Sequence, residues 1–159
     1  MEEQEDGVYG FWQKIVINFK VFFILLLISP MVFGEIYPYK ILRIIDGDTI
    51  IVEAPFLPKP LKPQMPLRIQ SIDTPEKSHY RAKCSSEIEL GIKATEFLKT
   101  LINQGKDIKI QIIGEDKFGR LLGDVIIDGQ FVSDLMKKAK YAKSYYGAKK
   151  PDWCNLNEQ

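Results

Sequence analysis

One long segment with a single apolar face, residues 86–104, separates two groups of strand-like segments and most limits how this chain can fold. Ser86 and Glu89 have the spacing of a capping box, and Gly105 ends the periodic pattern. The apolar residues of the segment recur at helical spacing: Ile88, Leu90, Ile92, Ala94, Phe97, Leu98, Leu101 and Ile102. Since the flanking segments alternate apolar and polar residues, as β-strands do, the chain is predicted to be α+β.

Five short segments carry the strand pattern, and they cover residues 37–45, 49–53, 65–72, 108–113 and 121–127. Residues 54–66 contain five prolines and are predicted to form an extended loop, because proline cannot donate to a sheet ladder. A shorter second helix is expected at residues 133–140. One helix inserted after the third strand and another near the C-terminus indicate an OB-fold, a five-stranded, partly open β-barrel.

The N-terminal segment, residues 1–34, differs from the rest of the chain. Two lysines precede an apolar stretch of 13 residues, 21–33, which is short for a bilayer span and typical of the apolar part of an export signal. The alternatives are an uncleaved inner-membrane anchor over residues 15–33 and a buried N-terminal helix of the folded domain. We therefore expect a signal peptide or anchor at 1–34, a folded domain at 35–159, and export to the periplasm or the medium.

Charge and cysteine content describe the remaining domain. Removing the two lysines and four acidic residues of the first segment from totals of 22 and 21 leaves 20 basic and 17 acidic side chains, a net charge of +3. A mildly basic domain suits a polyanionic partner without requiring one.

The two cysteines of the chain are Cys84 and Cys154, and disulfides persist in exported domains. The sequence leaves open whether they pair.

Three short motifs place acids and arginines together in one order: Asp46-Gly47-Asp48, then Arg68 followed by Asp73-Thr74-Pro75-Glu76, then Asp116-Lys117-Phe118-Gly119-Arg120. Each motif alone has an ordinary explanation as a hairpin turn, a helix start or a strand connection. Together they combine two chemistries. Carboxylates collect hard cations such as calcium, and arginines bind phosphate oxygens two at a time. The combination indicates phosphoryl chemistry rather than ion storage.

Positions at strand ends bring these side chains within reach of one another. Asp48 follows the first hairpin turn and Asp73 follows the third strand, so both carboxylates are expected above the same sheet. Glu76 is three residues further on, where it could serve as a general base one water away from a metal.

In this order, the three motifs resemble those of the staphylococcal nuclease (thermonuclease) family, over roughly residues 38–146. The resemblance implies an OB-fold and Ca2+-dependent hydrolysis of DNA and RNA. The roles that it implies are Asp48, Asp73 and Thr74 as calcium ligands, Asp46 as an acid just outside the ligand set, Glu76 as the residue that orients or deprotonates water, and Arg68 and Arg120 as the phosphate-binding arginines.

Several positions depart from the family pattern. The usual short hairpin is replaced by the proline-rich loop, Phe118 stands in place of a tyrosine, and Lys140 stands where glycine commonly ends the second helix. The chain lacks a long C-terminal helix and resembles shorter bacterial relatives, in which cysteines at the positions of Cys84 and Cys154 are familiar. Lys117, Phe118 and Tyr146 are expected to contact substrate, Lys117 at a terminal phosphate and Tyr146 in the nucleotide pocket.

The sequence thus predicts a monomeric, exported, calcium-dependent nuclease with little sequence preference. Lysines interleaved with tyrosines over residues 137–150 favour single-stranded or flexible nucleic acid. Two alternatives are a non-catalytic OB-type binding module and a membrane-anchored interaction protein. The first would be marked by a missing acid or arginine, and here none is missing.

Overall fold

A mixed sheet with two helices forms the part of the chain that the computed structural model describes, residues 34–155. Its elements are β1 (Glu35–Tyr37), β2 (Ile41–Ile44), β3 (Thr49–Glu53), β4 (Gln64–Ile69), β5 (Ile72–Asp73), α2 (Ser85–Gln104), β6 (Ile108–Glu115), β7 (Leu121–Ile127), β8 (Gln130–Phe131), α3 (Val132–Lys138) and β9 (Lys143–Ser144). The α+β prediction is confirmed. The predicted signal or anchor lies outside the described residues, apart from Gly34, and stays a prediction.

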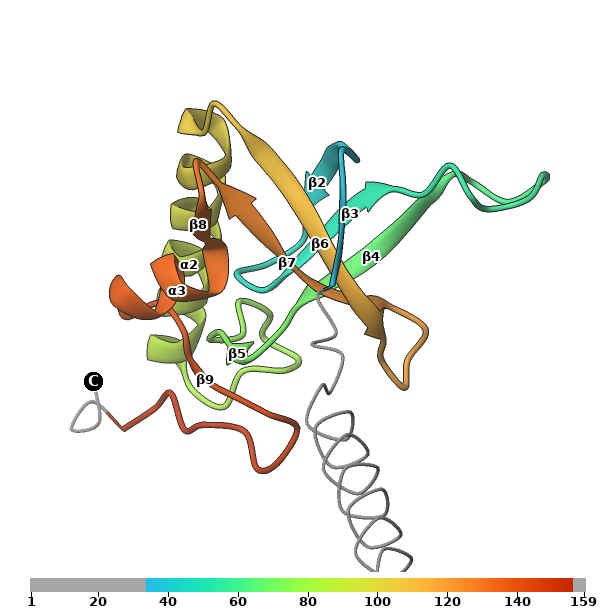
Figure 1. The fold of residues 1–159 in the computed structure, drawn as a ribbon. Helices are drawn as coiled ribbons and strands as arrows, with labels where there is room; N and C mark the ends of the chain where they lie inside the picture. The colour runs from blue at the N-terminus through green and yellow to red at the C-terminus, as the bar shows by residue number, and fades with distance from the viewer. Residues whose placement is uncertain (1–33, 156–159) are drawn as a thin grey trace, which may run out of the picture. The chain divides into compact units, whose positions relative to one another are not determined.

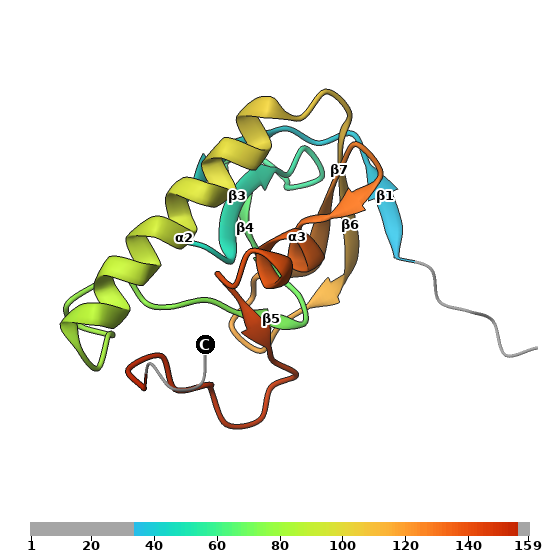
Figure 2. The same ribbon diagram turned by 90° about the vertical axis from the view of Figure 1, so that its left-hand side faces the viewer.

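The large sheet runs in the order β1-β6-β7-β4-β3-β2, with β8 added to β7, and β5 pairs with β9 in a separate small sheet. The five long strands are β2, β3, β4, β6 and β7, and α2 follows the third of them, as the OB-fold prediction requires. β1 and β2 are the two edge strands and are not paired with each other, so among the described strands hydrogen bonds do not close the barrel. Figures 1 and 2 show α2 lying along one side of the sheet, with α3 beside it.

The core lies between this sheet and the two helices because alternate residues of the strands point inward. Side chains from β3, β4, α2, β6, β7 and α3 fill it: Ile50, Val52, Leu67, Ile69, Ala94, Leu98, Ile110, Val125, Val132 and Met136. Because inward residues of β3 and β4 anchor the sheet here, their neighbours at the strand ends are held in fixed positions. Two of the predicted site residues occupy those ends, Asp48 directly before β3 and Arg68 near the end of β4.

Two predicted strands are divided in the structure. Of the segment 37–45, Tyr37 ends β1, which pairs with β6, and residues 41–44 form β2, which pairs with β3, since Pro38 interrupts the strand. The segment 65–72 ends as β4 at Ile69 and resumes as β5, because Ser71 takes a positive φ of 63°.

The proline-rich loop is shorter than predicted, since β4 already begins at Gln64 and includes Pro66 opposite Ile51. β4 pairs with β7 only from Leu67 onward, so Pro66 has no neighbour on that edge to which an N–H would donate. The remaining loop carries the β3–β4 hairpin away from the sheet (Figure 1).

The helix ends also differ in detail from the predictions. α2 begins at Ser85 with Cys84 as its N-cap and without a side-chain capping bond, so the Ser86–Glu89 capping box is wrong. Gly105 ends α2 with an extended backbone, and a Cβ there would lie 2.5 Å from Ile127 Cγ2. α3 ends at Lys138, and Lys140 has a φ of 63°, the conformation that glycine adopts more readily. No helix among residues 34–155 has both the length and the apolar character needed to cross a membrane.

Candidate active site

The turn between β2 and β3 fixes Asp48. Asp46 accepts the Asp48 N–H through Oδ1 at 3.1 Å, and the N–H groups of Ile45 and Asp46 donate to the Thr49 carbonyl at 2.9 and 3.2 Å. A Cβ at Gly47 would lie 2.8 Å from Thr74 Oγ1, so glycine allows this turn to approach the β5 segment closely. The acid predicted outside the ligand set, Asp46, therefore shapes the turn that presents Asp48.

Thr74 ties Asp48 to the end of β5. Its N–H and its hydroxyl both donate to Asp48 Oδ2 at 2.9 Å, while the Thr49 hydroxyl donates to Oδ1 at 3.1 Å. Asp48 and Thr74 are each 4% exposed. A buried carboxylate is costly unless it is hydrogen-bonded and faces a cation, and three donors meet part of that need here.

Arg68 of β4 supplies the cation. Its guanidinium forms ion pairs with Asp48 and, at 3.5 Å, with Asp73, and it donates to the Ile72 carbonyl at 3.0 Å. Burial lowers the pKa of Arg68 from its ordinary value, and the negative charge of Asp73 opposes that shift. Two carboxylates, one from the β2–β3 turn and one from the end of β5, thus converge on one positive group.

Asp116 organises the turn before β7. Its Oδ1 accepts the N–H groups of Phe118 and Arg120 at 2.8 and 3.1 Å, and its Oδ2 accepts from Arg120 Nε at 2.7 Å. Gly119 has a φ of 74°, which this tight turn requires. Desolvation alone would raise the pKa of Asp116, but the hydrogen bonds from Arg120 lower it overall. The half-buried Arg120 is therefore held in place by an ionised partner.

Glu76 is positioned by α2. Its N–H donates to Glu87 Oε1 at 3.3 Å, and Glu87, 4% exposed in the first turn of α2, also accepts the Lys83 N–H at 2.7 Å. The Glu76 carboxylate accepts from Lys150 Nζ at 3.0 Å. A Cβ at Gly91 would lie 2.6 Å from the Pro75 carbonyl oxygen, so this glycine lets the helix backbone touch the segment that carries Glu76.

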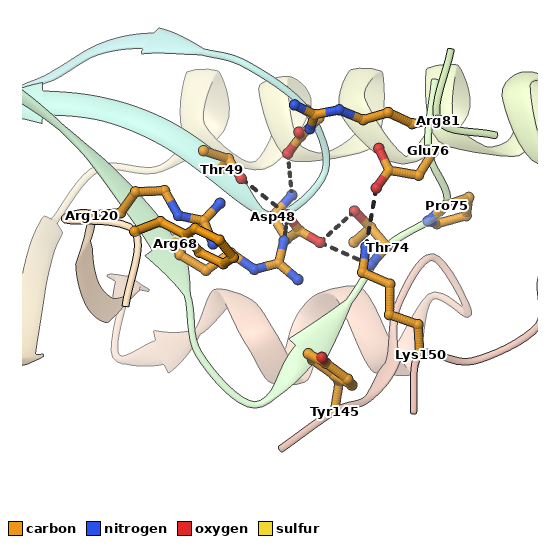
Figure 3. A pocket seen from close by; sticks show the side chains of 12 residues that line it. Asp48, Thr49, Arg68, Thr74, Pro75, Glu76, Arg81, Arg120, Tyr145 and Lys150 are labelled. Carbon is orange, nitrogen blue, oxygen red and sulfur yellow. Dashed lines mark hydrogen bonds and ion pairs between the residues drawn. The ribbon is translucent and has the colours of Figure 1, made fainter. Parts of the chain in front are cut away.

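A pocket of about 560 Å³ joins these groups. Its lining is Asp46, Asp48, Thr49, Arg68, Thr74, Pro75, Glu76, Arg81, Phe118, Arg120, Tyr145 and Lys150. In Figure 3, Arg81 enters from the side opposite Tyr145, and Lys150 reaches toward Glu76. Asp73, 1% exposed, does not line the pocket, and its carboxylate meets the pocket's cations Arg68 and Lys150 instead.

A second hollow adjoins the first and shares Arg68, Phe118, Arg120 and Tyr145 with it. Lys117 and Tyr146 line this second hollow. Phe118 is 71% exposed, with Lys117 Nζ 5.1 Å and Arg120 Cζ 5.4 Å from its ring centre, and Tyr146 is 80% exposed. Exposed rings beside cations can stack on nucleotide bases next to bound phosphates.

The donor set fits a hard divalent cation. Asp48 and Asp73 offer carboxylate oxygens that converge on the Arg68 guanidinium, and the pocket beside them is open to water and lined by polar groups. Calcium takes six to eight oxygen ligands, including backbone carbonyls and waters, which is the chemistry of such a set.

The structure brings together every charged residue predicted from the three motifs and places the predicted substrate-contacting residues in the adjoining hollow. The Cys84–Cys154 disulfide is formed. The sequence interpretation missed Glu87, Gly91, Trp153 and Arg81, and it placed Lys150 and Tyr145 only in the general lysine–tyrosine surface of residues 137–150. Of the four missed residues, Glu87 alone left a sequence signal, as an acid in the first turn of the predicted helix.

Comparison with known proteins relates this chain to one protein family. The family model described as "Staphylococcal nuclease homologue" matches residues 66–158. The chain is 34% identical over 122 residues to "Endonuclease YhcR" of Bacillus subtilis (strain 168), covering 74% of this chain and 10% of that protein. It is 29% identical over 117 residues to "Uncharacterized endonuclease" of Escherichia coli O157:H7, covering 73% and 65%. With "Thermonuclease" of Staphylococcus hyicus the identity is 32% over 110 residues, covering 68% and 59%. The chain thus spans less than two-thirds of the length of each of these relatives.

Proposed function

Because the chain belongs to the staphylococcal nuclease family, we propose that it is an endonuclease that hydrolyses phosphodiester bonds of DNA or RNA. The observation that carries the proposal is the convergence of Asp48 and Asp73 on Arg68, beside the pocket that Asp48 and Arg68 line together with Glu76 and Arg120. This reaction needs carboxylates that bind a cation, a further carboxylate that accepts a proton, and two guanidinium groups that donate hydrogen bonds to the phosphate.

In this proposal Asp48, Asp73 and the Thr74 carbonyl would hold Ca2+. A bound calcium ion would neutralise charge on a phosphate oxygen. Thr74 and Thr49 keep Asp48 in one orientation through three hydrogen bonds, so its ligand atoms would not have to reorganise.

Glu76 would orient the attacking water and accept its proton, since its carboxylate lines the pocket and remains partly exposed. Arg68 and Arg120 would donate to the phosphoryl oxygens as charge accumulates on them, and Asp116 keeps the Arg120 fork oriented toward that task. Phe118 and Tyr146 would stack on flanking bases, which favours single-stranded substrate.

Export, by a cleaved signal or with an uncleaved anchor, is part of the proposal, as is a monomeric state. Its support is the composition of residues 1–34 and the disulfide, which is typical of exported proteins.

The test uses single-stranded DNA and RNA with the full chain, in calcium and in excess chelator. Glu76→Gln removes the proton acceptor and should lower kcat by about 10²–10⁴-fold. Glu89→Gln, the same change at an exposed position of α2, is the matched control and should retain full activity. Arg120→Lys keeps the charge but loses the fork, and should lower kcat more than it raises KM.

A folded wild-type protein that cleaves neither nucleic acid in calcium would overturn the proposal and favour a non-catalytic binding module. Cleavage that persists in chelator would refute the calcium requirement alone.

A further inference from the structure

The C-terminal tail, residues 150–154, lies against the active site. It follows β9, which pairs with β5, and it ends at Cys154 in the disulfide to Cys84, directly before α2 (Figure 1). Trp153 is 3% exposed, and its indole Nε1–H donates to Asp73 Oδ2 at 3.0 Å. Lys150 forms an ion pair with Asp73 Oδ1 at 3.1 Å. The tail therefore contacts both oxygens of this carboxylate.

Trp153 is held from more than one side. Its neighbour Cys154 is covalently bound to the start of α2, and Lys143 Nζ lies 4.9 Å from the indole ring centre. Lys143 Nζ also donates to the carbonyl of Asp152 at 3.0 Å. With the residues before and after it fixed, the indole N–H has a defined direction.

The two oxygens of Asp73 have different partners. Oδ2 accepts from the indole, which can only donate, while Oδ1 faces Arg68 at 3.5 Å and Lys150 at 3.1 Å. The indole thus occupies one oxygen and leaves the other directed at the cations of the site. Without the bond from the indole, the Asp73 carboxylate could rotate and present its two oxygens differently to Arg68 and Lys150.

We infer that Trp153 is a positioning residue that orients Asp73 for calcium, and that the Cys84–Cys154 disulfide holds Trp153 in place. The inference rests on the proposed function, in which Asp73 is a calcium ligand. Partners that orient metal ligands typically contribute 10–100-fold to metal affinity.

The main test is Trp153→Phe, which keeps an aromatic ring for packing and removes the N–H. The calcium dissociation constant, measured by calorimetry on the full chain without substrate, should rise about tenfold. The kcat measured at saturating calcium should change much less than the calcium concentration needed for half-maximal activity. Tyr141→Phe is the matched control, because it also removes one polar group from an aromatic side chain, here from a ring that packs on Phe97, and its calcium affinity should equal that of the wild type.

The disulfide is tested by fluorescence. The sequence has two tryptophans, Trp12 and Trp153, so Trp12→Phe leaves the indole beside Asp73 as the single reporter. Calcium should change its emission with a midpoint equal to the calorimetric dissociation constant. Adding Cys84→Ser and Cys154→Ser should move that midpoint to higher calcium, and this measurement also decides the matter if Trp153→Phe does not fold.

The outcomes separate the two proposals. Wild-type protein that binds no calcium would overturn the proposed metal site, and this inference with it. Wild-type protein that binds calcium, with unchanged affinity in Trp153→Phe or an unchanged midpoint in the cysteine variant, would overturn the inference alone.

Discussion

Gly91 offers the sharpest test of how α2 positions Glu76. A Cβ at this position would lie 2.6 Å from the Pro75 carbonyl oxygen and 2.7 Å from the Glu76 carbonyl carbon, whereas ordinary contact begins at 3.4 Å. Since both neighbours are backbone atoms, Gly91→Ala must move the segment that carries Glu76 by roughly 0.8 Å, the difference between 3.4 and 2.6 Å.

Such a displacement affects activity more than stability. Misplacing a catalytic group by about 1 Å can cost about 10²-fold, so kcat should fall by about 10–100-fold with little change in KM. Alanine is favoured over glycine inside a helix by about 1 kcal/mol, which partly offsets about 1–3 kcal/mol of overpacking. The free energy of unfolding should therefore fall by no more than about 2 kcal/mol.

The assay measures kcat and KM on a single-stranded oligonucleotide, together with denaturant unfolding of the same preparations. Gly114→Ala is the matched control, because a Cβ at Gly114 meets nothing within 4 Å, and its activity should equal that of the wild type. If Gly91→Ala is folded and its kcat lies within twofold of wild type, the contact between α2 and the Glu76 segment does not set the geometry of catalysis.

Three further predictions concern charge. Asp116→Asn can keep one oxygen as the acceptor for the turn, but its NH2 group replaces the oxygen that accepts from Arg120 Nε. The kcat should therefore fall about tenfold while calcium affinity is unchanged, and an equal loss of calcium affinity would contradict this. Lys150→Gln removes an ammonium that pairs with Asp73, so calcium should bind up to about fivefold more tightly by calorimetry, and weaker binding would refute the competition. Burial raises the pKa of Asp124 to about 6 from its ordinary 3.8, so the folded state binds more protons and stability falls as pH rises from about 4 to 6. Asp124→Asn should flatten that dependence and add up to about 3 kcal/mol at pH 8 in denaturant unfolding, whereas parallel pH curves would count against it.

The sequence predicted those parts of the site that depend on local order. Asp48, Asp73 and Arg120 each stand at a strand end or in a turn whose residues are adjacent in the chain, so alternation and turn chemistry place them. The strand limits were less accurate where one proline or one positive φ, at Pro38 or Ser71, divides a continuous pattern.

The contacts that the sequence did not predict join residues across long separations or through the backbone. Lys150 and Glu76 are 74 residues apart, and Trp153 and Asp73 are 80 apart, so no local pattern links them. Gly91 looks like a weak point in a helix until the segment packed against it is known. The predicted capping box is absent because α2 begins at Ser85, so Ser86 lies inside the helix, and Glu87 instead accepts the N–H groups of Lys83 and Glu76.

The parallel pairing of β4 with β7 has a consequence for the order of assembly. Arg68 lies opposite Leu122, two residues after Arg120, so the two arginines become neighbours only when these strands pair. Hairpins such as β3–β4 close short loops, whereas parallel strands far apart in sequence pair slowly. In a refolding chain the two arginines would meet only after the local hairpins had formed, so the return of the proposed nuclease activity would report the pairing of β4 with β7 rather than the collapse of the core.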